Sequence, residues 1–185
     1  MTATSTSTRA YIIDPAHSSA HFSVRHLMIS KVRGTFRTLA GTIELPADAS
    51  IPLAVSAEID AASIDTREAQ RDAHLKSADF FDAEQFPKLR FTSTRVEPLD
   101  STRFKLVGDL EIHGVKRSVT LDAEVSGQGK DLHGNDRVAF EATARINRSA
   151  FGLVWNAALE TGGVAVGDEI DITLDVESIP APKHA

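Results

Sequence analysis

The chain has 185 residues and no cysteine, which excludes disulfide bonds, thiolate catalysis and cysteine-ligated zinc and slightly favours a reducing compartment. It has no run of about 20 apolar residues that could span a membrane as a helix. It also lacks a basic block, because 20 Lys and Arg face 26 Asp and Glu for a formal charge of -6, so nucleic acid is not expected as a partner. With 42% hydrophobic and 25% charged residues, the composition predicts one globular domain that buries its own core.

The two ends of the chain are poor in apolar residues. Met1 to Arg9 has no basic segment followed by an apolar stretch, so we expect no signal peptide and a cytoplasmic protein. Because small polar residues cannot bury apolar surface, residues 1–9 and 180–185 are predicted to be tails. Residues 10–179 are then expected to form the single domain.

Apolar and polar residues alternate along most of the chain, as a strand with one buried face requires. The alternation is clearest in four C-terminal runs, 104–112, 119–125, 138–146 and 170–176. It also predicts strands at Tyr11–Asp14, Ser18–Leu27, Val32–Leu45, Leu53–Ile59 and Leu89–Val96. Gly34 and Gly41 are placed where the long third strand of this set would bend.

Only one segment of the sequence shows a pattern that predicts a helix. Thr66–Ser77 follows Asp65 and carries Glu68 three residues later, which resembles a capping box. Residues 61–88 are therefore predicted to be one partly helical excursion. Eight or nine strands with short turns favour an all-β fold with antiparallel pairing. Alternation alone does not distinguish an eight-stranded barrel from a flattened sandwich.

The histidines near the N-terminus are the main candidates for chemistry. His21 and His26 have opposite parity in the predicted strand, so a zinc site built with His17 is not expected. His26 shares the apolar face of Phe22 and Val24, where it could be a hydrogen-bonded core residue, a contact to a ligand headgroup or a catalytic base. The motifs GxSxG and HExxH are absent, and neither catalytic nor metal-binding residues are predicted.

Aromatic residues divide into two groups. Phe80, Phe81 and Phe86 lie in the excursion, whereas the other Phe residues and Trp155 are spread through the predicted sheet. They form either an ordinary core or a lumen lined by aromatic side chains with the excursion as its lid.

Four ordered segments carry a family resemblance. The first is DPAHSSAHFSVRHLMISKVRGTF (Asp14–Phe36), and the others span Ala61–Thr94, Gly108–Glu124 and Ile146–Glu177. Together they resemble the YceI-like family of polyisoprenoid-binding, lipocalin-like proteins. The resemblance implies an extended eight-stranded antiparallel barrel, an elongated apolar lumen that holds an isoprenoid chain, and often a homodimer. Many members of that family look exported, whereas this chain shows no leader.

The sequence and the resemblance together predict non-catalytic binding, storage or transport of a polyisoprenoid or similar long-chain amphiphile. The bound molecule would be an isoprenoid quinone or a polyprenyl lipid, with no other cofactor and with transient contact to a membrane. The residues expected to line the lumen and bind the ligand are Phe22, Val24, His26, Phe36, Phe81, Phe91, Leu106, Phe140 and Trp155.

Two alternatives belong to other functional classes. One is a small enzyme that acts on an amphiphile at the barrel mouth with His26 or His17 as general base. The other is a filled barrel that serves as a stress or interaction protein. A continuous apolar pocket of about 300 Å³ or more would oppose the filled barrel.

Overall fold

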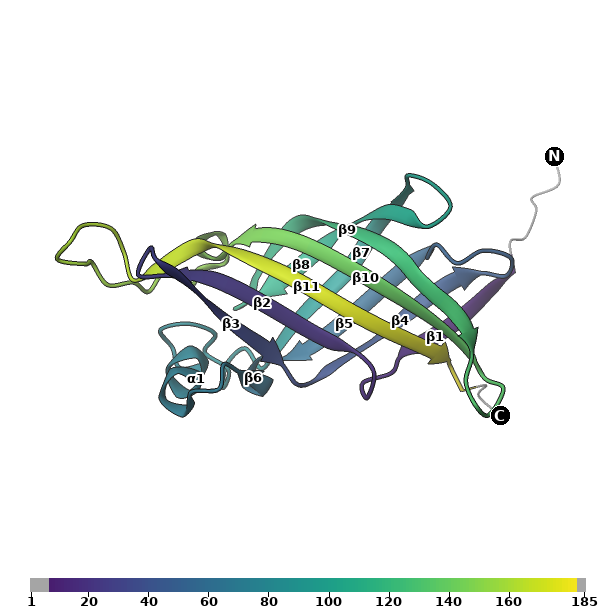
Figure 1. Cartoon of the computed structure of the whole chain (residues 1–185), viewed down its shortest axis with the longest axis horizontal. Helices are drawn as coiled ribbons and strands as arrows, with labels where there is room; N and C mark the ends of the chain where they lie inside the picture. The colour runs from purple at the N-terminus through teal and green to yellow at the C-terminus, as the bar shows by residue number, and fades with distance from the viewer. Residues whose placement is uncertain (1–6, 183–185) are drawn as a thin grey trace.

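The computed structural model describes residues 7–182, and most of them lie in antiparallel strands (Figure 1). The strands are β1 (Thr8–Ile13), β2 (Ser19–His26), β3 (Ser30–Phe36), β4 (Leu39–Pro46), β5 (Ala54–Asp60), β6 (Ile64–Asp65), β7 (Lys88–Pro98), β8 (Arg103–Ile112), β9 (Val115–Lys130), β10 (Asp136–Asn147) and β11 (Val166–Pro180). The helical elements are α1 (Ala69–Lys76) and the 3₁₀ turns η1 (Ala61–Ser63) and η2 (Arg148–Phe151).

The predicted domain boundaries lie close to the first and last strands. Thr8 and Arg9 belong to β1, and Pro180 belongs to β11, so the sheet includes residues that the sequence assigned to tails. Of those tails, residues 1–6 and 183–185 lie outside the described residues. In residues 7–182, no helix is both long enough and apolar enough to cross a membrane.

Eight strands close into a barrel in the order β1, β4, β5, β7, β8, β9, β10, β11. The last strand pairs back onto the first, with Tyr11 opposite Pro180 and Ile13 opposite Ser178. This closure confirms the predicted eight-stranded antiparallel barrel and excludes the flattened sandwich.

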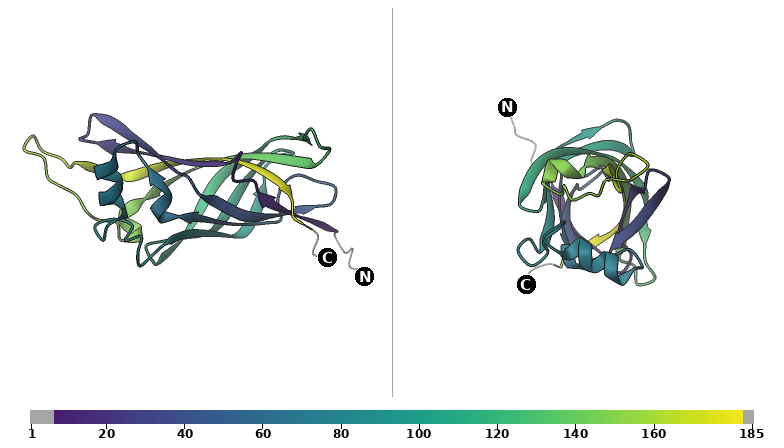
Figure 2. Two further views of the ribbon diagram at one scale, coloured as in Figure 1. Left: turned by 90° about the horizontal axis from the view of Figure 1, so that it is seen from below. Right: turned by 90° about the vertical axis from the view of Figure 1, so that its left-hand side faces the viewer.

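The last barrel strand has two partners on one of its edges. The end of β11 nearest the C-terminus pairs with β1, whereas its earlier part, from Val166 to Asp175, pairs with β2. Strands β2, β3 and β6 therefore continue the sheet toward the end of the barrel where α1 lies (Figures 1 and 2). The start of β1 and the end of β11 lie at the opposite end (Figure 1).

The predicted single strand Val32–Leu45 is wrong, because the structure has two strands, β3 and β4, in its place. The chain leaves the sheet at Arg37 and Thr38, whose backbone N–H groups donate to the Ser63 carbonyl at 3.1 Å and the Ser63 hydroxyl at 3.2 Å. Gly34 does not bend a strand here. A side chain at Gly34 would collide with the Phe22 ring, so this glycine makes room for an inward aromatic residue.

The excursion 61–88 is partly helical, as predicted, but its helix begins later. Glu68 is the N-cap of α1, and its carboxylate accepts from the N–H groups of Gln70 at 3.1 Å and Arg71 at 2.5 Å. Asp65 instead accepts from the N–H of Arg67 at 2.8 Å. Because Arg67 has a φ of +62°, the helix cannot start before it, and the predicted capping box is wrong.

Candidate functional site

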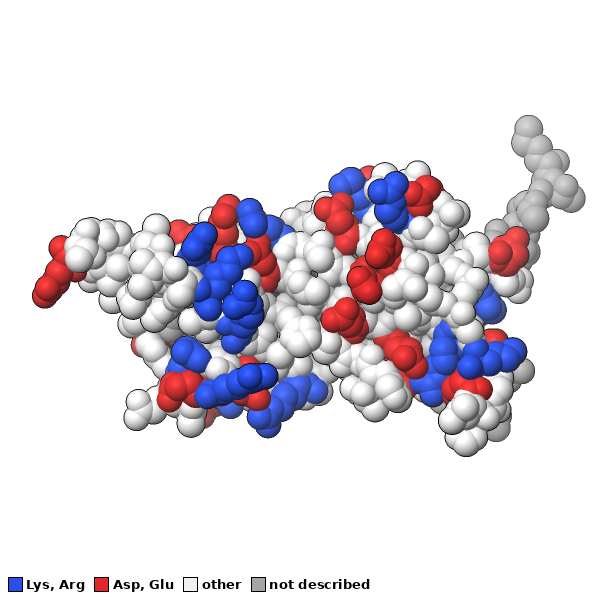
Figure 3. All heavy atoms as spheres, in the orientation of Figure 1, with Lys and Arg blue, Asp and Glu red and all other residues white. Residues whose placement is uncertain are grey.

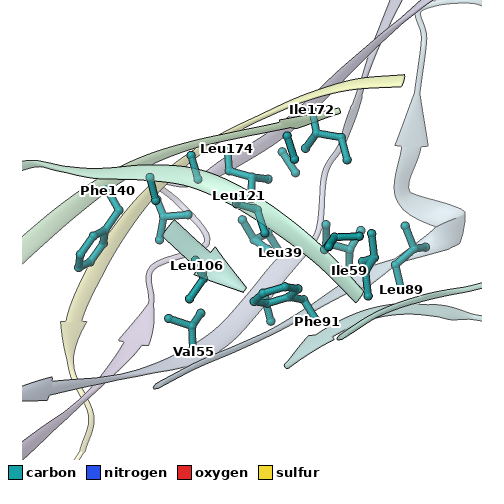
Figure 4. Close-up of a pocket in the computed structure, with 18 of the residues that line it drawn as sticks. Leu39, Val55, Ile59, Leu89, Phe91, Leu106, Leu121, Phe140, Ile172 and Leu174 are labelled. Carbon is teal, nitrogen blue, oxygen red and sulfur yellow. The ribbon is translucent and has the colours of Figure 1, made fainter. Parts of the chain in front are cut away.

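The inner face of the barrel surrounds a cavity of about 170 Å³ (Figure 4). The alternating pattern of the sequence puts one apolar side chain of every two into this space. Its lining comes from all eight barrel strands and from β2 and β3, and includes Leu39, Val55, Ile59, Leu89, Phe91, Leu106, Leu121, Phe140, Ile172 and Leu174.

Almost no polar surface faces the cavity. Among the described residues that line it, only His21 and Arg90 are polar. The His21 ring lies 2.9 Å from the Ser19 hydroxyl, and Arg90 donates to Glu58 at 3.0 Å on the outer face of the sheet. Since the strand neighbours of both residues point inward, their side chains point outward and the lumen itself is apolar.

Small residues keep the lumen from filling with its own side chains. Ala142 and Ala144 occupy successive inward positions of β10. On β8, the inward position Gly108 lies against the Phe91 ring, and a Cβ atom there would stand 2.5 Å from the ring. The end of the Phe91 ring therefore lies over Gly108 on the neighbouring strand.

The two ends of the cavity differ in burial. Toward the chain termini the barrel is filled by Tyr11, Leu45 and Phe104, which are 2%, 0% and 2% exposed. Toward α1, the inward side chains of Phe22 and Phe36 are only half-buried. We call the first the closed end. We call the second, formed by the β2–β3 turn, α1 and residues 152–165, the mouth end.

Five of the nine residues predicted to bind the ligand line this cavity. They are Phe22, Phe36, Phe91, Leu106 and Phe140. Their contact with a ligand stays a prediction.

The other four predicted residues, Val24, His26, Phe81 and Trp155, lie at the mouth end outside the lining. Val24 and His26 follow the lining part of β2, where His26 pairs with Ser30 and with Val166. The Phe81 ring packs edge-on against the Phe36 ring at 5.8 Å. The Trp155 ring contacts the rings of His74 and Phe80, with centroids 4.7 and 5.4 Å apart.

Neither histidine considered as a general base lines the cavity. His17 lies at the closed end, with its Nδ1 atom 2.9 Å from Asp14 Oδ2. The ring of His17 and the carboxylates of Asp14 and Glu177 could in principle surround a cation. However, Arg137 donates to Asp14 at 2.6 Å and to Glu177 at 2.9 Å, so a guanidinium already neutralises this cluster.

The Asp14 carboxylate is strongly stabilised in its charged form. Hydrogen bonds from His17 and Arg137 lower its pKa to about 2. Arg137 also binds Asp131 at 3.1 Å, and the four residues join the β1–β2 loop, the β9–β10 loop and β10. This ion-pair network stabilises the closed end.

A buried arginine organises the mouth end and has no counterpart in the sequence prediction. The Arg148 side chain is 5% exposed and donates to the carbonyls of Leu153 at 2.7 Å and Trp155 at 2.9 Å. It also donates to the Gly167 carbonyl at 2.9 Å, and its burial lowers the pKa of the guanidinium. Arg148 thus fixes both ends of the segment 152–165 to the barrel.

Comparison with known proteins agrees with this architecture. The family model described as YceI-like domain matches residues 11–178. A UPF0312 protein of Staphylococcus aureus (strain bovine RF122 / ET3-1) is 38% identical over 168 residues, which cover 90% of this chain and 95% of that protein. A second relative, from strain USA300, is 37% identical over the same length.

Three solved structures have a similar fold. A Campylobacter jejuni YCEI protein superposes with a TM-score of 0.74 at 30% identity, covering 85% of this chain and 90% of that one. Burkholderia cenocepacia BcnA gives 0.76 at 24% identity, covering 89% and 98%. A polyisoprenoid binding domain from Saccharophagus degradans gives 0.67 at 15% identity, covering 94% and 99%. The last two likenesses concern the fold alone.

Proposed function

The chain belongs to the YceI-like family, and from that premise we propose that its lumen encloses the apolar chain of a polyisoprenoid lipid without changing it chemically. The ligand we propose is an isoprenoid quinone or a polyprenyl lipid. The observation that carries the proposal is a lumen whose lining is apolar apart from two outward-pointing residues. Such a lining favours a hydrocarbon chain and gives no anchor to a polar molecule.

The empty volume of the lumen has an energetic cost for the folded protein. At about 24 cal/mol per Å³ of cavity, the volume of about 170 Å³ costs the folded state roughly 4 kcal/mol. A ligand that occupies the space removes this cost. The filled-barrel alternative leaves the void without a purpose.

The cavity is nevertheless smaller than the roughly 300 Å³ of an ordinary ligand pocket. Its size alone therefore does not oppose a filled barrel. A long chain fits if lumen side chains rotate aside or if its polar end stays outside at the mouth. Half-buried Phe22 and Phe36 are the side chains placed to move.

Chain length would govern affinity. Ten buried carbons contribute about 8 kcal/mol at roughly 0.8 kcal/mol each, which is comparable to the roughly 4 to 15 kcal/mol lost on association. Only a chain of several isoprene units exceeds that cost by a useful margin.

The lumen also favours binding over catalysis. A general acid or base must reach the reacting proton directly or through one water, and no titratable side chain points into the cavity among residues 7–182. A headgroup would lie at the mouth end, where polar side chains begin.

Native mass spectrometry of the purified protein, with solvent extraction of what it carries, tests the proposal. We expect a co-purifying lipid with an isoprenoid chain and uptake of a fluorescent prenyl analogue. Geranylgeraniol should compete with that analogue more strongly than a straight-chain alcohol of equal carbon number. Equal competition would overturn the isoprenoid assignment, and a protein that takes up neither chain would overturn binding itself.

A matched pair of variants tests whether the ligand occupies the lumen. Ala144 faces the cavity, whereas its neighbour Thr143 is exposed on the outer face. We expect Ala144→Phe to weaken uptake at least tenfold and Thr143→Phe to leave it unchanged. Because overpacking costs roughly 1 to 3 kcal/mol, thermal unfolding of Ala144→Phe and of the milder Ala144→Leu must show a folded barrel. Full uptake by a folded Ala144→Phe protein would place the ligand elsewhere.

A further inference from the structure

Large hydrophobic side chains are exposed mainly at the mouth end. Five of the eight in the described residues lie there: Leu27, Met28, Ile29, Val154 and Val164. We call these five the mouth patch. Met28 and Ile29 are 58% and 79% exposed. Apolar side chains that gather on one exposed surface mark an interaction site for a protein or a membrane.

The mouth patch is held together by direct contacts. The Leu27 N–H donates to the Ala165 carbonyl at 2.9 Å, and Met28 lies against Gly163. The β2–β3 turn and residues 152–165 therefore form one surface, which projects beyond the barrel (Figure 1).

The backbone of the β2–β3 turn is strained. Leu27 and Met28 have φ values of +51° and +64°, a conformation for which turns select glycine or asparagine. Two large apolar residues in these positions cost the fold both strain and exposed surface. A role in binding gives a physical reason for keeping them.

Basic side chains lie behind the mouth patch. Arg25 and Arg33 are exposed on the outer face of β2 and β3, and Arg67 is exposed beside β6. In the described part of the chain, none of the three forms an ion pair with a carboxylate. Figure 3 shows Lys and Arg side chains gathered on this half of the molecule, with Asp and Glu side chains among them. Two exposed carboxylates of β11 at this end are paired with other cations, Asp168 with Arg148 at 3.3 Å and Glu169 with Arg145 at 3.8 Å.

We infer that the mouth end docks onto an anionic lipid bilayer, with the mouth patch in the interfacial region and the three arginines against lipid phosphates. The inference rests on the proposed function, because docking brings the less buried end of the lumen to the membrane from which an isoprenoid lipid would enter. Apolar side chains flanked by Arg and Lys are the combination that interfacial binding uses.

A second copy of the chain fits this surface less well. In a symmetric contact between two mouth patches, both copies would bring the same three arginines to one interface, which adds like charge. An anionic bilayer matches both the three unpaired arginines and the apolar residues. Glu160, which lies in the segment 152–165, opposes docking, so Glu160→Gln should strengthen it.

Sedimentation with vesicles tests the docking on the complete chain. We expect binding to vesicles of phosphatidylcholine with phosphatidylglycerol, weaker binding in high salt, and little binding to phosphatidylcholine alone. Ile29→Ser should reduce binding roughly tenfold. Arg25→Gln and Arg33→Gln should each reduce it about fivefold, as one lost charge near an anionic surface implies.

Two control variants make the same kinds of substitution at exposed positions away from the mouth end. Leu132 is 102% exposed in the β9–β10 loop, and Arg95 is exposed on β7. Leu132→Ser and Arg95→Gln should leave vesicle binding unchanged. Equal losses in the control and mouth variants would overturn the inference, as would no vesicle binding by the unmodified protein.

Two more readouts separate the outcomes. If Ile29→Ser abolishes self-association in analytical ultracentrifugation but vesicle binding is absent, the mouth patch is an interface between copies and the inference is wrong. Uptake of the prenyl analogue supplied from ethanol needs no membrane. If that uptake persists while vesicle binding is absent, the docking fails and the proposed function stands.

Discussion

The closed end and the mouth end of this barrel are built from the same alternating strands, but their side chains are packed differently. At the closed end, inward residues such as Phe104 fill the barrel, and the Arg137 network ties the loops together. At the mouth end, inward residues such as Phe22 border open space, and apolar residues face outward. The tight packing that stabilises the barrel and the open space of its lumen are thus separated along one barrel axis.

The largest expected difference concerns two phenylalanines. Phe104→Ala should lower the free energy of unfolding by about 3 to 5 kcal/mol, because the lost ring leaves a cavity in a packed region. Phe22→Ala should cost only about 1 to 2 kcal/mol, since its ring is only partly buried. Urea denaturation measures both values. Equal losses would show that the mouth end is packed as tightly as the closed end.

Substitution of Arg148 tests how strongly the stability of the mouth end depends on one buried charge. We expect Arg148→Met to lower the free energy of unfolding by about 2 to 3 kcal/mol, because it leaves buried carbonyls without donors. Hydrogen exchange should accelerate in residues 152–165 and remain slow in β1 and β4. Arg145→Met, on the exposed face of β10, is the control and should change neither measurement noticeably.

The pH dependence of stability should report on the closed end. The pKa of Asp14 is lowered from 3.8 to about 2 by His17 and Arg137. Because the folded state holds the proton less tightly than the unfolded state, this stabilisation is complete above pH 3.8 and is lost as the pH falls toward 2. Asp14→Asn should lower stability by roughly 1 to 2 kcal/mol at neutral pH.

The same substitution should flatten the acid limb of the stability profile measured by urea denaturation at several pH values. Asp48→Asn, at an exposed position, is the control and should leave the profile unchanged. An acid limb that is as steep in Asp14→Asn as in the unmodified protein would contradict the role assigned to the Asp14 network.

The smallest expected effect concerns an exposed ion pair at the mouth end. Lys31 binds Asp171 at 2.9 Å, and both side chains are more than one third exposed. Lys31→Ala should therefore lower the free energy of unfolding by less than about 1 kcal/mol. A larger loss in thermal or urea denaturation would mean that the mouth end relies on surface charge for its stability.

The strand faces could be read from the sequence because the alternation of apolar and polar residues is a local property. It placed Phe91, Leu106 and Phe140 on the inner face, where the structure has them. The closed eight-stranded barrel came from the family resemblance, since the alternation alone also fits a sandwich.

The rest depends on contacts between segments that are distant in the sequence. The break between β3 and β4 is set by Ser63, and the start of α1 by the positive φ of Arg67. The alternation of apolar and polar residues continues to His26, although this part of β2 lies beyond the cavity. Arg148 resembles any surface arginine in the sequence, and only the fold of residues 152–165 buries it.

The pairing of β1 with β11 brings the two ends of the described chain side by side, with the Ala181 N–H donating to the Ala10 carbonyl at 2.8 Å. A short peptide could therefore join them, and new termini could be opened in an exposed loop as a circular permutation. The same geometry suits attachment to a surface or to another protein. A tether at either terminus would hold the molecule by its closed end and leave the opposite end unobstructed.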